Sequence, residues 1–187
     1  IMVFNDSRVI PARLMGKRGD AKIEILLHKR VTDTMWQCFA KPAKKLKEGD
    51  KVVFADDFVG EVRHKTPEGQ VVLDFGIGDV LLSHYLGEHG QMPLPPYIEK
   101  KRAADEADKS DYQTVYAAYE GSVAAPTAGL HFTKELLAHI NDMRVRCVSV
   151  TLHVGGGTFL PVKEKDTDDH VMHSEWASIS AETARAI

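Results

Sequence analysis

Histidines gather in the second half of the chain beside glycine, proline and acidic residues. Of the nine histidines, His131, His153, His170 and His173 stand in such surroundings. Imidazoles exchange protons near neutral pH, so these side chains suit general acid–base catalysis. They also bind metals, but the chain has no HExxH sequence and His170-x-x-His173 is a weak ligand pair. We therefore expect no metal site.

A glycine loop, VGGGTF at residues 154–159, comes directly after His153 and a predicted strand. Ligands of α/β proteins bind beyond the carboxyl ends of strands, and glycine amides can hold an anion or a carboxylate there. The sequence is neither GxGxxG before a helix nor GxxxxGK[ST], and Pro161 stops a helix soon afterwards. A tight turn, with His153 bonded to nearby backbone, is equally compatible with this pattern.

Two further segments carry polar groups. NDSR, residues 5–8, follows the first predicted strand, and the guanidinium groups of Arg8 and Arg13 suit a carboxylate, a phosphate or ordinary salt bridges. HVMHSE, residues 170–175, sets a histidine near Glu175. That segment predicts either an acid–base pair or an edge strand with its polar side chains outward.

Four lysines form a basic cluster in the sequence KPAKKLK: Lys41, Lys44, Lys45 and Lys47. The formal net charge of the chain is −3, so a basic field over the whole protein is absent and any nucleic-acid binding must use a local patch. These lysines can contact RNA phosphates, although a solvated loop explains them equally simply.

The elements that position these groups fall into two kinds. Between residues 12 and 80, short β-rich runs recur with turn residues between them, which predicts a small antiparallel barrel or sandwich. The runs are Lys22–Leu27, Met35–Ala40, Lys51–Phe54, Phe58–Arg63 and Gln70–Phe75.

From residue 111 the period changes. Aromatic residues at 112, 116 and 119 predict a helix with its tyrosines on one face. Thr133 can cap a helix that continues to Asn141, with Leu136, Leu137 and Ile140 facing inward. Residues 145–154 predict a strand whose one face carries Cys147, Ser149, Thr151 and His153. A helix followed by a strand and a glycine loop is typical of an α/β fold.

We therefore expect an α/β domain, barrel-like, with an inserted small antiparallel β-barrel. Residues 1–11 and 95–187 would form the α/β domain and residues 12–94 the barrel. The prolines of MPLPPY, residues 92–97, predict an extended connector, and the charged residues 99–110 predict a mobile loop.

Composition narrows the class of protein. The chain has 187 residues, of which 43% are hydrophobic, as in ordinary globular proteins. Its two cysteines cannot build a disulfide scaffold, which predicts a reduced, cytoplasmic protein. No apolar run approaches the roughly 20 residues of a membrane span, so we expect no membrane partner. The first residues read as the middle of a strand, and we expect the chain to be part of a longer protein.

Several motifs together resemble one enzyme family. NDSRVIPARL, MPLPPYI, DYQTVYA, AAPTAGLHFT, TLHVGGGTFLPV and HVMHSEW occur in this order over nearly the whole chain. They resemble the S-adenosylmethionine:tRNA ribosyltransferase-isomerases of queuosine biosynthesis. The sequences Gly-Thr-Thr-Ser-Val-Arg and Thr-Asn-Phe-His-Leu-Pro of that family are absent, and its members are about twice as long, so the resemblance implies a partial chain.

The resemblance implies transfer and isomerisation of the ribosyl group of S-adenosylmethionine, a co-substrate. The acceptor would be 7-aminomethyl-7-deazaguanine at the wobble position of tRNA. Epoxyqueuosine would form in the tRNA while adenine and methionine leave, with no metal or redox cofactor. We also expect the protein to be a monomer. The sulfonium acidifies the ribose C5′ protons, so a base must remove one, and water must be kept out.

The resemblance also suggests roles for residues. His131 and His153 are the catalytic candidates, facing one pocket. Thr127 would bond the nucleoside, Phe132 and Phe159 would stack on a base, and Tyr97, Tyr112 and Tyr116 are candidates for stacking a flipped wobble base. The methionine end would sit on the Gly155–Gly157 amides or on Arg8. The full set of substrate-binding candidates is Asp6, Arg8, Arg13, Tyr97, Tyr112, Tyr116, Thr127, Gly129, Phe132, Gly155, Gly156, Gly157, Thr158, Phe159, His173 and Glu175.

Two alternatives stay open. One is a non-catalytic RNA-binding module in which the barrel and the lysine cluster are the working part. The other is a metal hydrolase that uses His131, His153, His170 and His173.

Overall fold

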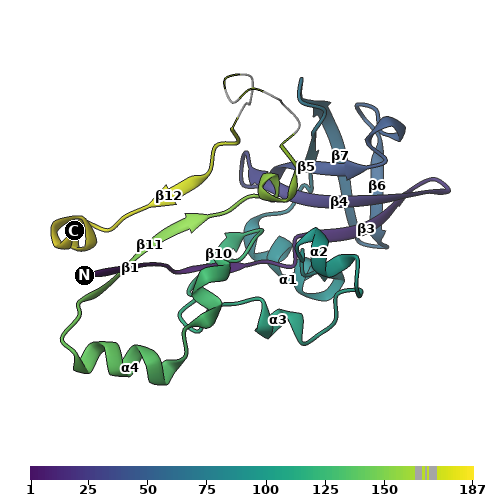
Figure 1. Cartoon of the computed structure of the whole chain (residues 1–187). Coiled ribbons are helices and arrows are strands. Elements are labelled where there is room, and N and C mark those ends of the chain that lie inside the picture. Colours follow the sequence, from purple (N-terminus) through teal and green to yellow (C-terminus); the bar gives the residue numbers. More distant parts are fainter. Residues whose placement is uncertain (163–165, 167, 169–171) are drawn as a thin grey trace.

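The barrel is a closed ring of six antiparallel strands. The computed structural model describes residues 1–162, 166, 168 and 172–187. In it, each barrel strand pairs with the next around the ring, and β6 pairs back onto β3 (Figure 1). The predicted small barrel is thus confirmed. The strands, in spatial order, are β3 (Arg13–Arg18), β4 (Ala21–Arg30), β5 (Met35–Lys41), β8 (Val71–Asp74), β7 (Phe58–Lys65) and β6 (Lys51–Ala55).

Alternation of side chains explains why these runs close into a barrel. Ile23, Ile25 and Leu27 on β4 are fully buried, while the residues between them are more exposed. Because successive side chains of a strand point to opposite faces, this pattern fills the barrel interior from one face of each strand. Helix α1 (Asp79–His89) adds Leu82 and Leu86 to the same core, and β9 (Gly90–Gln91) pairs with β3.

The α/β part is built around an interrupted central strand. Its first half, β1 (Met2–Asn5), lies parallel to β11 (Cys147–His153), and its second half, β2 (Ser7–Val9), lies parallel to β10 (Tyr119–Ser122). Strand β12 (Trp176–Ser178) pairs antiparallel with β11. Figure 1 shows this part of the chain to one side of the barrel.

The short helices are held by local contacts. Thr133 caps α4 (Lys134–Asp142) by accepting a 3.1 Å hydrogen bond from Leu136 N, as predicted, and Ser180 caps α5 (Ala181–Ala186). The remaining helices are α2 (Pro96–Glu99), α3 (Asp108–Asp111) and the 3₁₀ turns η1 (Ala43–Lys45), η2 (Thr127–His131) and η3 (Gly156–Phe159). Among the residues described, no helix is both long and apolar enough to cross a membrane.

The predicted helix over the tyrosines of residues 112–119 is wrong. Tertiary hydrogen bonds replace it: the side chain of Gln113 bonds both N and O of Val9, and Ala118 N donates to Asp6 O. These bonds draw the segment against the central strand, where it continues as β10. Long-range pairing therefore overrides the helical spacing of the aromatic residues.

Two other expectations also need correction. Pro96 and Tyr97 begin helix α2 instead of continuing an extended connector. Proline is tolerated at the first helical position because the N–H that it lacks has no partner within a helix there. The charged residues that follow are tied down, since Asp108 is 2% exposed and accepts two bonds from the guanidinium of Arg102.

Helix α4 does not bury the leucines expected to face inward. Leu136 is 41% exposed, and no residue of the helix is fully buried by the part of the chain that the structure describes. Two hydrophobic cores are nevertheless present. One fills the barrel, and the other joins Val9, Met92, Leu94, Tyr112 and Ala125. The division at residues 11/12 and 94/95 stays a proposal, although Met92, on the barrel side of that division, packs in the second core.

Candidate active site

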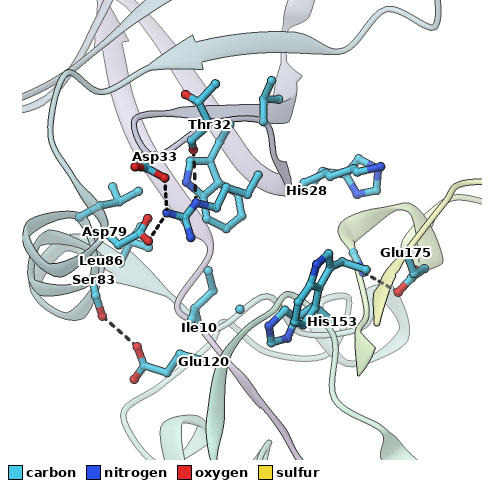
Figure 2. Close-up of a pocket in the computed structure, with 18 of the residues that line it drawn as sticks. Ile10, His28, Thr32, Asp33, Asp79, Ser83, Leu86, Glu120, His153 and Glu175 are labelled. Atoms are coloured by element: carbon cyan, nitrogen blue, oxygen red, sulfur yellow. Dashed lines mark hydrogen bonds and ion pairs between the residues drawn. The ribbon is translucent and has the colours of Figure 1, made fainter. Parts of the chain in front are cut away.

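A cavity of about 540 Å³ lies between the barrel and the sheet of β11 and β12. We call it the barrel cavity. Strand β4, its following turn and α1 form one wall, and β10, β11 and the segment before β12 form the other. Figure 2 shows Asp33 and Asp79 across the cavity from His153 and Glu175. Arg30 bonds both Asp33 and Asp79, so its positive charge is compensated within the wall.

A second cavity of about 690 Å³, the sheet cavity, adjoins the first. The two share Glu120, His153 and Trp176 as lining residues. The other residues that line the sheet cavity are Asp6, Ala118, Tyr119, Ser149, Thr151, Ser178, Ser180 and Thr183. His153 therefore lies where the barrel cavity meets the sheet cavity, and several hydroxyl groups line the sheet cavity.

His153 is held by its strand partner and by a glycine. It is the last residue of β11 and lies opposite Trp176 of β12, with ring centroids 4.8 Å apart and planes 17° from parallel. A Cβ built on Gly121 would come within 2.7 Å of His153 Nε2, so only glycine leaves the ring this room. The position of the imidazole is thus fixed by its stacking on Trp176 and by the backbone of Gly121.

Burial lowers the pKa of His153, while the nearby charge of Asp6 opposes that shift. The imidazole is consequently neutral near pH 7 and able to accept a proton. Its Nδ1 is buried and has no hydrogen-bond partner among the described residues. A neutral imidazole beside a cavity has the properties of a general base.

The three glycines of the loop pack against the barrel and against histidines. A Cβ on Gly155 would meet His28 Nδ1 at 2.5 Å, one on Gly156 would meet Leu26 at 3.1 Å, and one on Gly157 would meet His173 at 2.5 Å. Gly155 N already donates to Glu175 Oε2 at 3.1 Å, so this amide is engaged within the protein. Partial burial raises the pKa of the Glu175 carboxyl, and the hydrogen bond from Gly155 N opposes this shift.

His28 is a buried histidine in the wall of the barrel cavity. It is 7% exposed, and burial lowers the pKa of its imidazole to about 4, with smaller contributions from His173 and Lys29. Its Nδ1 lacks a partner within the described chain. The unfolded chain, in which the pKa is near the ordinary value of about 6.5, binds the proton more readily between these two values.

We therefore expect the contribution of His28 to stability to be complete above pH 6.5 and to be lost on acidification. The free energy of unfolding of the full-length protein should fall by roughly 3 kcal/mol through this group between pH 6.5 and pH 4. Urea unfolding at several pH values would measure it. The His28→Gln variant should lack most of that fall and exposed His64→Gln should keep it; equal pH dependence in all three proteins would contradict the assignment.

The structure brings some of the predicted site residues to these cavities. Asp6 lines the sheet cavity, Gly155 and Glu175 line the barrel cavity, and His153 lines both. His173 lies behind the wall, edge-on to His28 with centroids 5.3 Å apart. Gly156 and Gly157 are buried in η3 beside them, Thr158 is exposed, and Phe159 packs on the barrel core.

Other predicted residues lie apart from the cavities. His131, exposed at the end of η2, is not among the lining residues of either cavity, so the structure does not bring the two catalytic candidates together. Thr127 is exposed as well, and buried Gly129 packs against Thr114 and Tyr116. Phe132 lies edge-on to Phe4 at 5.1 Å, in an aromatic cluster that also contains Tyr116.

The remaining candidates have partners within the protein or lie on its surface. Arg13 bonds Glu24 at 2.6 Å and also pairs with Glu99, which links β3 to α2. Exposed Arg8 donates to Ala117 O at 2.8 Å. Tyr112 is 5% exposed, whereas Tyr97 is 65% exposed and is the predicted tyrosine with the most accessible ring.

Sequence reasoning missed Trp176, Gly121 and Glu120. Trp176 was visible only as the end of the HSEW motif, and its contact with His153 depends on the register of two strands. No group of three or more His, Cys, Asp or Glu in the described residues is arranged to hold a metal ion. His170, one of the four histidines of the metal alternative, lies outside the described residues.

Comparison with known proteins identifies the family. The family model described as "Queuosine biosynthesis protein" matches residues 1–187. A relative from Maricaulis maris, named S-adenosylmethionine:tRNA ribosyltransferase-isomerase, is 52% identical over 195 residues, which cover 100% of this chain and 55% of the relative. A relative of the same name from Rhodospirillum rubrum is 53% identical and is covered to 54%.

A solved structure is also similar. It is a crystal structure of an S-adenosylmethionine tRNA ribosyltransferase from Thermotoga maritima, 28% identical, with a TM-score of 0.40, covering 98% of this chain and 45% of that one. The chain spans about half the length of the curated relatives that it matches. Because the family model matches from the first residue to the last, the chain belongs to the queuosine biosynthesis protein family.

Proposed function

We propose that the full-length protein transfers and isomerises the ribosyl moiety of S-adenosylmethionine onto 7-aminomethyl-7-deazaguanine at the wobble position of tRNA. Epoxyqueuosine-tRNA forms, and adenine and methionine are released. The observation that carries the proposal is the match of the whole chain to relatives of that name at 52–53% identity. S-adenosylmethionine acts as co-substrate, without a metal or redox cofactor, in a cytoplasmic monomer.

The chemistry of the cavities supports this proposal. Transfer requires removal of a proton from C5′, which the adjacent sulfonium acidifies, and a neutral imidazole is suited to that step. His153 is such an imidazole, placed where two cavities adjoin. The barrel cavity is bounded by two parts of the chain, so a ligand there would contact both of them.

The test is a direct assay on the full-length protein. S-adenosylmethionine is incubated with tRNA that carries 7-aminomethyl-7-deazaguanine, and the release of adenine is followed together with the mass of the wobble nucleoside. Appearance of both products supports the proposal. A folded protein that binds this tRNA but yields neither product would overturn it in favour of the non-catalytic RNA-binding module.

The lysine cluster of the barrel supports tRNA as the partner. Lys44 and Lys45 are exposed on η1, with Lys41 and Lys47 exposed on either side. We expect the double variant Lys44→Glu/Lys45→Glu to bind tRNA at least about 10-fold more weakly at low salt and to lower the salt slope by about 2.

Filter binding at several salt concentrations would measure both quantities. The control is Lys134→Glu, which makes the same exchange once, with half the change in net charge, at an exposed position on α4 and should leave tRNA affinity nearly unchanged. An equal loss of affinity in the control and the cluster variant would show only a general charge effect and would remove the lysine cluster from the proposal.

A further inference from the structure

The central strand changes partners at Asp6. Before this residue β1 pairs with β11, and after it β2 pairs with β10. The backbone of Asp6 itself bridges the two neighbours, since Asp6 N donates to Val150 O at 3.0 Å and Asp6 O accepts from Ala118 N at 2.8 Å. Where parallel strands part towards different neighbours, the carboxyl ends enclose a crevice that commonly binds ligands. The sheet cavity lies at this point.

The polar face of two paired strands forms a wall of the sheet cavity. Ser149, Thr151 and His153 alternate along β11, and the antiparallel register sets Ser178 opposite Thr151 and Trp176 opposite His153. The wall therefore carries hydroxyl groups at one end and a pair of stacked aromatic rings at the other. Trp176 is 54% exposed, so its indole remains accessible beyond the stack with His153.

Asp6 completes a set of groups suited to a sugar diol. Its Oδ1 accepts a 2.7 Å bond from Thr151 Oγ1, which orients the carboxylate. For Oδ2 no hydrogen bond or ion pair exists with any described residue. Carboxylates that follow a parallel strand bind ribose hydroxyls in this way, because both sugar hydroxyls can donate to the same group.

The charge of the cavity distinguishes between possible ligands. Within the described part of the chain, Asp6 and Glu120 line the sheet cavity and no lysine or arginine does. Two carboxylates repel a phosphate and favour an uncharged or cationic ligand. A nucleoside therefore fits this lining better than a nucleotide, and a nucleoside that carries a positive charge fits it best.

From these observations we infer that the sheet cavity is a ribonucleoside subsite, in which Asp6 binds the ribose hydroxyls and Trp176 stacks on the base. The inference rests on the proposed function and deepens it, since the adenosyl group of S-adenosylmethionine is a nucleoside beside a sulfonium cation. A ribose held by Asp6 would lie next to His153, which lines the same cavity.

The inference is tested by competition on the full-length protein. Adenosine, 2′-deoxyadenosine and 3′-deoxyadenosine compete for binding with radiolabelled S-adenosylmethionine. On the unmodified protein we expect the deoxynucleosides to compete about 10- to 100-fold more weakly than adenosine, because each loses a hydrogen bond to a charged group. In the Asp6→Asn variant this preference for ribose should shrink to a few-fold.

A matched control and a parallel assay separate the outcomes. Asp20→Asn removes the same charge in an exposed turn of the barrel and should keep the full ribose preference. The subsite is overturned if the unmodified protein has no ribose preference or if Asp6→Asn keeps it. Release of adenine by the unmodified protein, measured on the same samples, tests the proposed reaction independently, so either conclusion can fail without the other.

Discussion

Replacing His153 with glutamine is expected to lower the rate of adenine release by about 10²- to 10⁴-fold, the usual contribution of a general base. Glutamine keeps a polar side chain of similar reach but cannot accept a proton near neutral pH. His153 is only partly buried, so the variant should still fold. Single-turnover release of adenine from S-adenosylmethionine on the full-length protein measures the effect.

Two other histidines make this test specific. His139→Gln, on the exposed side of α4, should leave the rate unchanged. His131→Gln examines the second catalytic candidate, which lies outside both cavities. A full loss of rate at His131 with little loss at His153 would transfer the role of base to His131 and contradict the assignment made from the cavities.

The pH dependence of the rate should follow the protonation of His153. Burial lowers its pKa below the ordinary value of about 6.5, so the basic form is already dominant at neutral pH. The value of kcat/KM should therefore begin to decline at a more acidic pH than it would for a solvent-exposed imidazole. A decline that begins above pH 7 would be inconsistent with a buried, neutral imidazole.

Substitution of Gly121 by alanine is the second change with a large expected effect. Gly121 has a φ of +142°, a conformation that residues with a Cβ rarely adopt. The added Cβ would also lie 2.7 Å from His153 Nε2 and 2.9 Å from its Cδ2 and Cε1. The backbone or the imidazole must therefore move, although Gly121 itself contributes no functional group.

We expect Gly121→Ala to lower the free energy of unfolding by about 1–3 kcal/mol and the rate of adenine release by at least about 10-fold. Thermal unfolding and the adenine assay, on the same preparation, measure the two effects. Gly87→Ala is the control, because Gly87 lies in α1 and an added Cβ would meet no heavy atom within 4 Å beyond its chain neighbours and the helix backbone. Alanine there should raise stability by about 0.5–1 kcal/mol. Unchanged stability and rate in Gly121→Ala would show that the close contact with His153 has no functional consequence.

The sequence alone determined the features that depend on near neighbours along the chain. Alternation in Lys22–Leu27 and the other short runs predicted the strands of the barrel, and the cap at Thr133 predicted the start of α4. The polar face of β11 was also readable, because alternate residues of a strand share a face wherever the strand lies. The ordered motifs predicted the family.

Only the tertiary structure decided how these faces meet. The spacing of the tyrosines at 112 and 116 predicted a helix, but bonds from Gln113 to Val9 hold that segment against the central strand. The amphipathic pattern of α4 indicated an inner face, but Leu136 is buried only if another surface covers it. Phe159, a candidate for stacking on a base, packs on the barrel core through contacts that its local sequence does not indicate.

The candidate site depends on such long-range contacts throughout. Trp176 reaches His153 because β12 pairs with β11 in one register, and a shift of one residue would turn the indole to the other face of the sheet. Asp6 reaches Thr151 because the central strand lies beside β11, 145 positions away along the chain. Local patterns predict which side chains share a face of a strand or helix. The pairing of segments that are distant in the sequence determines which of these faces enclose a cavity.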